Sequence, residues 1–193
     1  MHTVLAPNLS VGPTWLPLAV VSVFVAAGWF AYSIDRQRPA QVLGHATSAS
    51  LTFFMLASVL LLVFNVVHKQ EAPVDLLRSA SALWVTNVIV FASWYWRLDA
   101  GGPHGRDQTI GHDKGSFLFP QMSLMDEKLA AMGYRAWSPG FIDYLFLAFN
   151  TSTALSPADT PALSRWSKLL MMTQALISLT VIVLLAARAV NML

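Results

Sequence analysis

The chain has 193 residues, of which 55% are hydrophobic and 11% are charged, and it carries a net charge of +2 and no cysteine. This charge density is about half that of soluble domains. The composition excludes a soluble globular enzyme, a disordered chain, a disulfide scaffold and a nucleic-acid-binding protein, and no thiolate can act as a nucleophile or metal ligand.

Four runs of the chain contain no Asp, Glu, Lys or Arg, namely 14–34, 46–67, 79–96 and 169–187. Each is close to the about 20 residues that a helix needs to cross about 30 Å of hydrocarbon. Trp and Tyr side chains stand at their ends, where headgroups favour such rings. The sequence therefore predicts an all-α integral membrane helical bundle, a single multi-pass domain of the cell membrane over 1–193. We place the spans at about 14–34, 46–67, 79–96 and 166–188.

The segment 97–140 begins with several glycines, and its basic and acidic residues balance. We expect an extramembrane loop that contains a short helix from Met125 to Gly133. No spacing arranges its potential ligands into a metal site, so we expect no metal there; these ligands are His104, Asp107, His112 and Asp113. No catalytic spacing or cofactor motif stands out in the chain, and we expect no enzymatic activity and no cofactor.

The segment 141–153 is apolar, but at 13 residues a helix would span only about 20 Å. Ser138 and Pro139 precede it as a cap residue and a first-turn proline, and Asp143 lies where the helix dipole favours an acid. Two prolines follow in 154–161, directly before the last span. We therefore expect a re-entrant half-helix and loop over 141–161, an arrangement that points to a pore or a water-filled cavity.

The order of residues from Asp143 to Asp159 resembles the pore helix and filter of the potassium-channel superfamily, and the helix after it resembles the inner helix. The family's filter, Thr-Val-Gly-Tyr-Gly-Asp, falls on 154–159, where Asp159 matches by identity. Thr151 and Thr153 match the hydroxyl-rich approach to that filter. The resemblance implies a pore subunit whose candidate filter residues are Thr151, Ser152, Thr153, Ala154, Leu155, Ser156 and Asp159.

A second resemblance covers most of the chain. The stretches Leu83 to Phe91, Trp94 to Pro103, Phe117 to Met122 and Trp137 to the C-terminus resemble an uncharacterised group of bacterial four-helix membrane proteins. This resemblance implies a four-helix architecture and no particular activity.

The candidate filter departs from the family at its glycines, because no Gly occurs after position 140. Carbonyl-lined potassium filters need conformations that Gly adopts at little cost, so potassium selectivity is not expected. Hydroxyls, Asp159 and the C-terminal end of the half-helix favour cations in general. We expect a weakly selective pore for monovalent cations; the alternative is a non-conducting membrane scaffold or a small transporter, in which the loop only packs.

Gln174 and Ser178 share one face of the last span, which makes them candidates for the pore lining. Such residues also hydrogen-bond neighbouring helices in membrane proteins, which is the commoner role.

One half-helix cannot enclose a pore, so the partners we expect are the lipid bilayer and further copies of the chain, in a homotetramer if the protein is channel-like. The orientation stays open. The channel resemblance puts both termini in the cytoplasm, whereas the distribution of Lys and Arg favours the opposite orientation.

Overall fold

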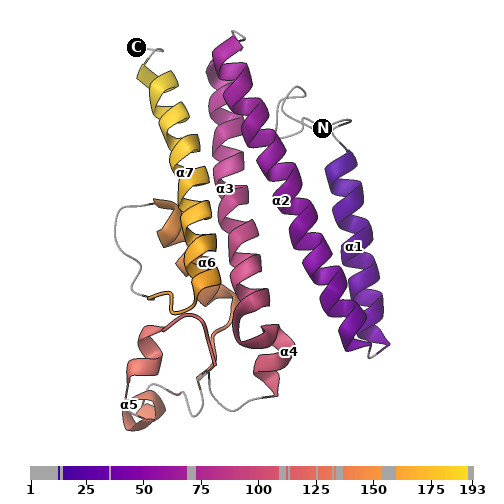
Figure 1. The fold of residues 1–193 in the computed structure, drawn as a ribbon, viewed down its shortest axis with the longest axis vertical. Coiled ribbons are helices and arrows are strands. Elements are labelled where there is room, and N and C mark those ends of the chain that lie inside the picture. The colour runs from indigo at the N-terminus through magenta and orange to yellow at the C-terminus, as the bar shows by residue number, and fades with distance from the viewer. Residues whose placement is uncertain are drawn as a thin grey trace. The chain divides into compact units, whose positions relative to one another are not determined.

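The structure is a computed structural model that describes residues 13, 15–34, 36–68, 73–108, 112, 114–124, 126–131, 133, 137–153 and 160–190. Four long helices run through the described chain (Figure 1), which are α1 (Leu16–Ser33), α2 (Gln37–His68), α3 (Pro73–Leu98) and α7 (Arg165–Val190). The shorter elements are η2 (Asp99–Gly101), α4 (Gly102–Asp107), η3 (Pro120–Ser123), α5 (Asp126–Ala131) and α6 (Phe141–Thr153).

All four long helices are long and apolar enough to cross a membrane. The prediction of four hydrophobic helices in an all-helical chain is therefore confirmed for the described residues. Two helices are longer than expected at their polar starts, since α2 begins at Gln37 and α3 at Pro73. Pro39 does not prevent the early start of α2, because the first turn of a helix needs no internal N–H donor.

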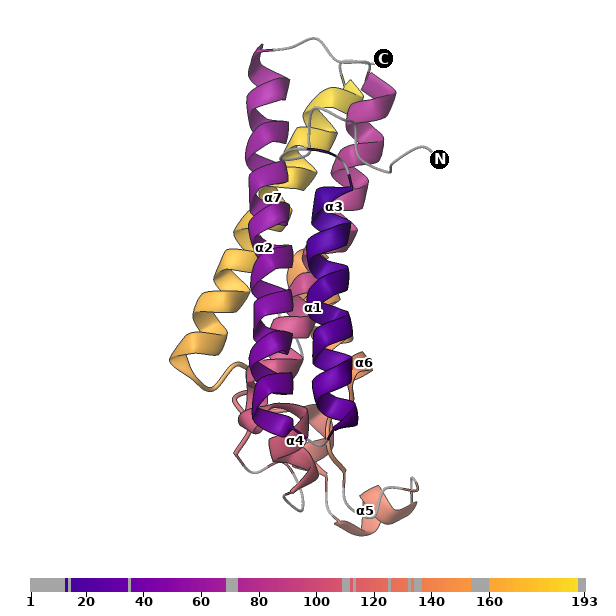
Figure 2. The same ribbon diagram turned by 90° about the vertical axis from the view of Figure 1, so that its right-hand side faces the viewer.

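The chain divides into two compact units, the first formed by 1–90 and 176–193 and the second by 91–175. The expectation of one membrane domain stays a prediction. In the first unit α1 lies beside α2 along its length, as Figures 1 and 2 both show. The buried core of this unit joins three helices and consists of Val59, Leu62, Leu76, Ala80, Leu83 and Val181.

The core of the second unit is aromatic and polar. Phe117 is fully buried and its ring lies 5.2 Å from that of Tyr95 and 6.3 Å from that of Tyr144. Phe119 packs edge-on against Tyr144 at 5.4 Å. Rings at these separations and angles attract one another beyond their burial. This core positions α6 and the first part of α7, which carry the candidate site.

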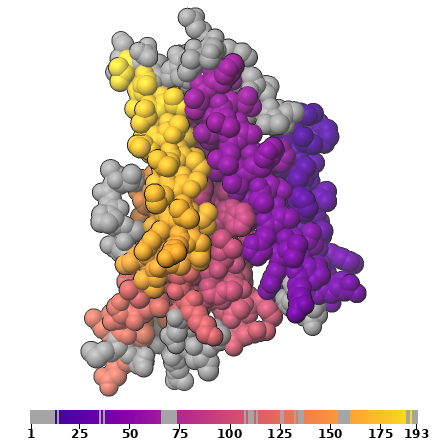
Figure 3. Space-filling model, in the orientation of Figure 1, coloured from indigo at the N-terminus to yellow at the C-terminus, as the bar shows by residue number. Residues whose placement is uncertain are grey.

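The outer side of α7 is apolar and uncovered in the chain (Figure 3), with Leu169, Met172, Leu176, Leu179 and Val183 all exposed. In water such a surface would be costly. Lipid is a suitable environment for it, in agreement with a membrane-spanning helix.

Candidate functional site

The start of α6 is capped by its own third residue. Asp143 accepts a 2.7 Å hydrogen bond from the backbone N–H of Gly140 through Oδ2. The first-turn acid is therefore where it was expected, whereas the cap residue is not. The helix begins at Phe141, as the segment 141–153 predicts, and Gly140 occupies the capping position that was expected at Ser138.

Tyr144, the next residue, joins the first turn of α6 to Asp99, directly after the end of α3. Its hydroxyl donates a 2.7 Å hydrogen bond to Oδ2 of Asp99, and both side chains are fully buried. Burial raises the pKa of the Tyr144 hydroxyl, and the negative charge of Asp99 raises it further. Tyr144 is therefore a proton donor at neutral pH, as this contact requires.

The Asp99 carboxylate is satisfied from two further directions. His112 Nε2 lies 2.8 Å from Oδ2, and the N–H of Ser116 donates to Oδ1 at 2.5 Å. Arg106 donates to the backbone oxygens of Asp99 and Trp96 at 2.8 and 2.9 Å, and its guanidinium lies 5.2 Å from the centre of the Tyr144 ring. A buried carboxylate is tolerable only with such partners. With its oxygens occupied and no exposed surface, Asp99 has a structural role.

A sharp turn delivers Asp99 to this position. Gly101 and Gly102 adopt φ values of 77° and 79°, a region that L side chains rarely occupy. A Cβ atom on Gly102 would also lie 2.8 Å from the carbonyl oxygen of Arg97. Gly102 therefore lets the chain fold back from α3 into α4, which brings Arg106 to Asp99.

Phe117 contacts both the start of α6 and the start of α7. It forms an antiparallel bridge with Ala162, and its ring lies 5.8 Å from that of Trp166 and 6.3 Å from that of Tyr144. The bridge is made by hydrogen bonds from Leu118 to Pro161 and from Leu163 to Ser116. Helix α6 ends at Thr153, and Ala162 lies again near the start of α6, because Ala162 and Tyr144 both contact Phe117.

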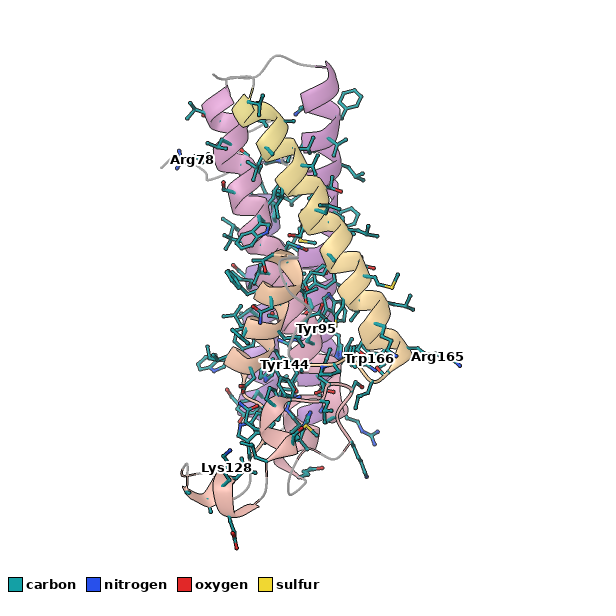
Figure 4. All side chains as sticks on the ribbon, turned by 90° about the vertical axis from the view of Figure 1, so that its left-hand side faces the viewer. Arg78, Tyr95, Lys128, Tyr144, Arg165 and Trp166 are labelled. Atoms are coloured by element: carbon teal, nitrogen blue, oxygen red, sulfur yellow. The ribbon has the colours of Figure 1, made fainter. Side chains whose placement is uncertain are left out.

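The far end of α6 is held by Gln174 of α7. Its Nε2 donates to the carbonyl oxygen of Ala148 and to Oγ of Ser152, both at 2.7 Å. Its Oε1 accepts a hydrogen bond of 2.5 Å from the hydroxyl of Tyr95. Tyr95 and Tyr144, which are labelled in Figure 4, are both fully buried.

These contacts make α6 and the first half of α7 parallel. Tyr144 and Trp166 meet at Phe117, whereas Ser152 and Gln174 meet eight residues further along each helix. Eight residues correspond to about 12 Å of rise in either helix. The two helices therefore run side by side in the same direction.

The three predicted hydroxyl residues at the end of α6 do not share one direction. Ser152 is fully buried against Gln174. Thr151 and Thr153 are half-buried and donate to the carbonyl oxygens of Leu147 and Asn150 at 2.8 and 3.0 Å. Positions two apart in a helix point about 200° apart, so these two threonines cannot face one axis while both belong to α6. The remaining filter candidates, Ala154, Leu155, Ser156 and Asp159, lie outside the described residues.

The two candidates for the pore lining are both buried within the chain. Gln174 contacts α3 and α6 as described, and Ser178 accepts a 2.9 Å hydrogen bond from Nε1 of Trp84. Both side chains therefore take part in contacts between helices, the alternative role considered for them.

The histidines of the 97–140 segment have separate partners. His104 contacts Gln108, and His112 contacts Asp99. Asp113 and the side chain of Asp107 are outside the described part. Within that part, no three His, Asp or Glu side chains gather as metal ligands would.

No sequence pattern predicts a shared site for Asp99, Tyr95 and Tyr144. One signal was available for Asp99, an acid three residues after the uncharged run 79–96, because such an acid needs a partner if the chain folds back over it. Comparisons with protein-family models, curated proteins and solved structures yield no match to this chain. The two family resemblances therefore stay predictions.

Proposed function

We propose that this protein is a subunit of a homo-oligomeric membrane pore that passes monovalent cations with weak selectivity. In this proposal α6 is a re-entrant half-helix, and its C-terminal end faces the pore. The proposal applies to the protein in a cell membrane and involves neither an enzymatic step nor a cofactor.

The observation that carries the proposal is the parallel pairing of α6 with the start of α7. A helix of 13 residues is too short to cross the hydrocarbon. Its first turn and the residues before α7 both pack on Phe117, which supports a path that would enter and leave the membrane on the same side. A re-entrant segment must begin and end on the same side of the membrane. Its irregular backbone lies against protein or water and not against lipid.

The chemistry at the end of α6 favours a cation. Thr153 shares the outer side of α6 with Ile142, Phe146 and Phe149, which are exposed. Its hydroxyl donates its proton to Asn150, so the oxygen lone pairs remain as acceptors. The C-terminal end of α6 adds a partial negative charge, and Asp159 would add a full one.

A second candidate function is a non-conducting membrane scaffold or a small transporter. It is favoured by the use of Ser152, Gln174 and Ser178 in hydrogen bonds within one chain. In that case α6 would be a packing element, and its hydroxyls would satisfy the helix end.

Cation flux into liposomes tests the proposal. The parent protein is compared with Asp159→Asn and Thr153→Val, with Thr173→Val as a control on the exposed side of α7. We expect Asp159→Asn to lower flux most at low ionic strength, where a lost ring of charge is screened least. Thr173→Val is expected to conduct as the parent does.

The mass of the reconstituted protein decides whether the flux result is interpretable. A tetramer that shows no flux of any monovalent cation across a range of potentials contradicts the proposal. A stable monomer without flux favours the scaffold or transporter.

A further inference from the structure

We infer that Gln174 is a positioning residue of the pore, whose amide, oriented by Tyr95, fixes the last turn of α6 against α7. The inference rests on the proposed function and deepens it. Gln174 then does not line the pore. It holds α6, the helix that precedes the candidate filter, in position. Tyr95, Gln174 and Ser152 are called the amide clamp below.

The orientation of the Gln174 amide follows from its partners. The carbonyl oxygen of Ala148 can only accept a hydrogen bond, so the Gln174 nitrogen must face α6. The amide oxygen then faces Tyr95, whose hydroxyl donates to it. One side chain of α7 thereby joins α3 to α6 with a defined direction at each bond.

Burial makes this arrangement specific. Tyr95, Ala148, Ser152 and Gln174 are each 0% exposed, so water cannot replace a lost partner. A buried amide without hydrogen-bond partners destabilises the folded protein. Gln174 avoids this cost by bonding to Tyr95 of α3 and to Ala148 and Ser152 of α6. A shift of α6 by one residue along α7 would break these bonds.

The apolar contacts of α6 do not supply the same precision. Leu147 and Ala148 are buried apolar side chains whose contacts have no preferred direction, whereas hydrogen bonds weaken steeply when their angles change. Tyr144 fixes the first turn of α6 through Asp99. The amide clamp fixes the last turn, directly before Thr153 and the chain that follows it.

The experiment uses the full-length protein in liposomes with two measurements. The first is hydrogen exchange of peptides that cover 147–153; the second is the ratio of Na⁺ to Cs⁺ flux. The variants are Gln174→Leu, Tyr95→Phe and the triple change Tyr95→Phe, Gln174→Leu and Ser152→Ala. Thr173→Val is the matched control, because Thr173 is exposed and its hydroxyl bonds only within α7 to Leu169 in the described chain.

We expect Gln174→Leu to speed exchange of the last turn of α6 about tenfold, the factor that corresponds to about 1.4 kcal/mol of local stability. The flux ratio should change at least about twofold, a shift of about 0.4 kcal/mol by the same conversion. Tyr95→Phe leaves the amide in place without its donor and should give a smaller change in both. Should Gln174→Leu fail to assemble, Tyr95→Phe still tests the inference.

The triple variant separates positioning from packing. It leaves no polar group of the amide clamp unpaired, so its melting temperature should recover relative to Gln174→Leu. Hydrogen exchange at 147–153 and the ratio of Na⁺ to Cs⁺ flux should stay altered, because the triple variant lacks the directional hydrogen bonds. Recovery of all three quantities together would overturn the inference, as would parental exchange in an assembled Gln174→Leu protein.

The two proposals fail in different ways. A parent protein that does not conduct contradicts the pore. Exchange at 147–153 still reports whether Gln174 fixes α6 in that case, and parental exchange in Gln174→Leu would reject the amide clamp whether or not ions pass.

Discussion

Gly115 lies so close to His112 that a Cβ atom at position 115 would stand 2.2 Å from Nε2 of the imidazole. The same Nε2 contacts the buried carboxylate of Asp99. The missing side chain at Gly115 therefore makes room for the contact between His112 and Asp99, whose Oδ2 also accepts the hydrogen bond from Tyr144 of α6. The close approach, and not an unusual backbone angle, explains the glycine at this position.

We expect Gly115→Ala to displace His112 and to lower the free energy of unfolding by about 1–3 kcal/mol, through steric strain and the loss of a buried hydrogen bond. Thermal unfolding in detergent, followed by tryptophan fluorescence, measures this change in stability. Gly28→Ala is the matched control, since the nearest atom to its new Cβ would be Cβ of Leu43 at 3.7 Å, an ordinary contact. An equal melting temperature for both variants would contradict the assigned role of Gly115.

A second prediction concerns Asp99 itself. Asp99→Asn replaces one acceptor oxygen by an N–H donor, while Tyr144, His112 and Ser116 all contribute donors to this carboxylate. We expect the free energy of unfolding to fall by about 2–4 kcal/mol. Hydrogen bonds to buried charged groups contribute about 1.5–3 kcal/mol each, and one donor must remain unpaired in this variant. The measurement is chemical or thermal unfolding of the detergent-solubilised protein.

Asp75→Asn is the control for Asp99→Asn, since Asp75 is exposed in the first turn of α3. Its effect should stay within about 0.5 kcal/mol. If the two asparagine variants unfold alike, Asp99 does not hold the second unit together as described.

Much of the architecture was predictable because membrane helices are specified by local composition. The uncharged run 79–96 became the central part of α3, and the short segment 141–153 became α6 with the expected bounds. Asp143 also lies in the first turn of α6, as its chemistry indicates. The longer α2 was missed because 37–45 is polar, and polarity does not prevent a helix from extending beyond the hydrocarbon.

The contacts of the candidate site were not predictable by the same reasoning. Asp99 meets Tyr144 across 45 positions of the chain, and Tyr95 meets Gln174 across 79. Helical periodicity places residues on a face but does not specify which distant face it meets. The sequence therefore favours a contact with another helix for Gln174 over a place in a pore lining, but it does not identify its partners on α3 and α6.

A third prediction concerns high pH. Because burial and Asp99 raise the pKa of Tyr144, the folded protein keeps a proton that the unfolded chain releases above about pH 10. The stability due to Tyr144 is therefore complete below about pH 10 and decreases as the pH rises further. Relative to Tyr144→Phe, the parent should lose up to about 1.4 kcal/mol for each pH unit above that value. Unfolding curves of both proteins between pH 8 and 11 provide the measurement, and parallel curves would contradict it.

The last prediction concerns the path of α6 relative to the membrane. The protein has no cysteine, so a single introduced cysteine reports its own position alone. If α6 is re-entrant, a cysteine at Thr153 is reached by a small charged thiol reagent from the same side of the membrane as one at the exposed Ser138. The reason is geometric: the first turn of α6 and the residues before α7 both contact Phe117, so in a re-entrant path water would reach this region from one side. Complete labelling of Thr153→Cys in denaturant controls for reactivity, and labelling of the intact vesicle only from the side opposite to Ser138→Cys would mean that the chain crosses the membrane at α6.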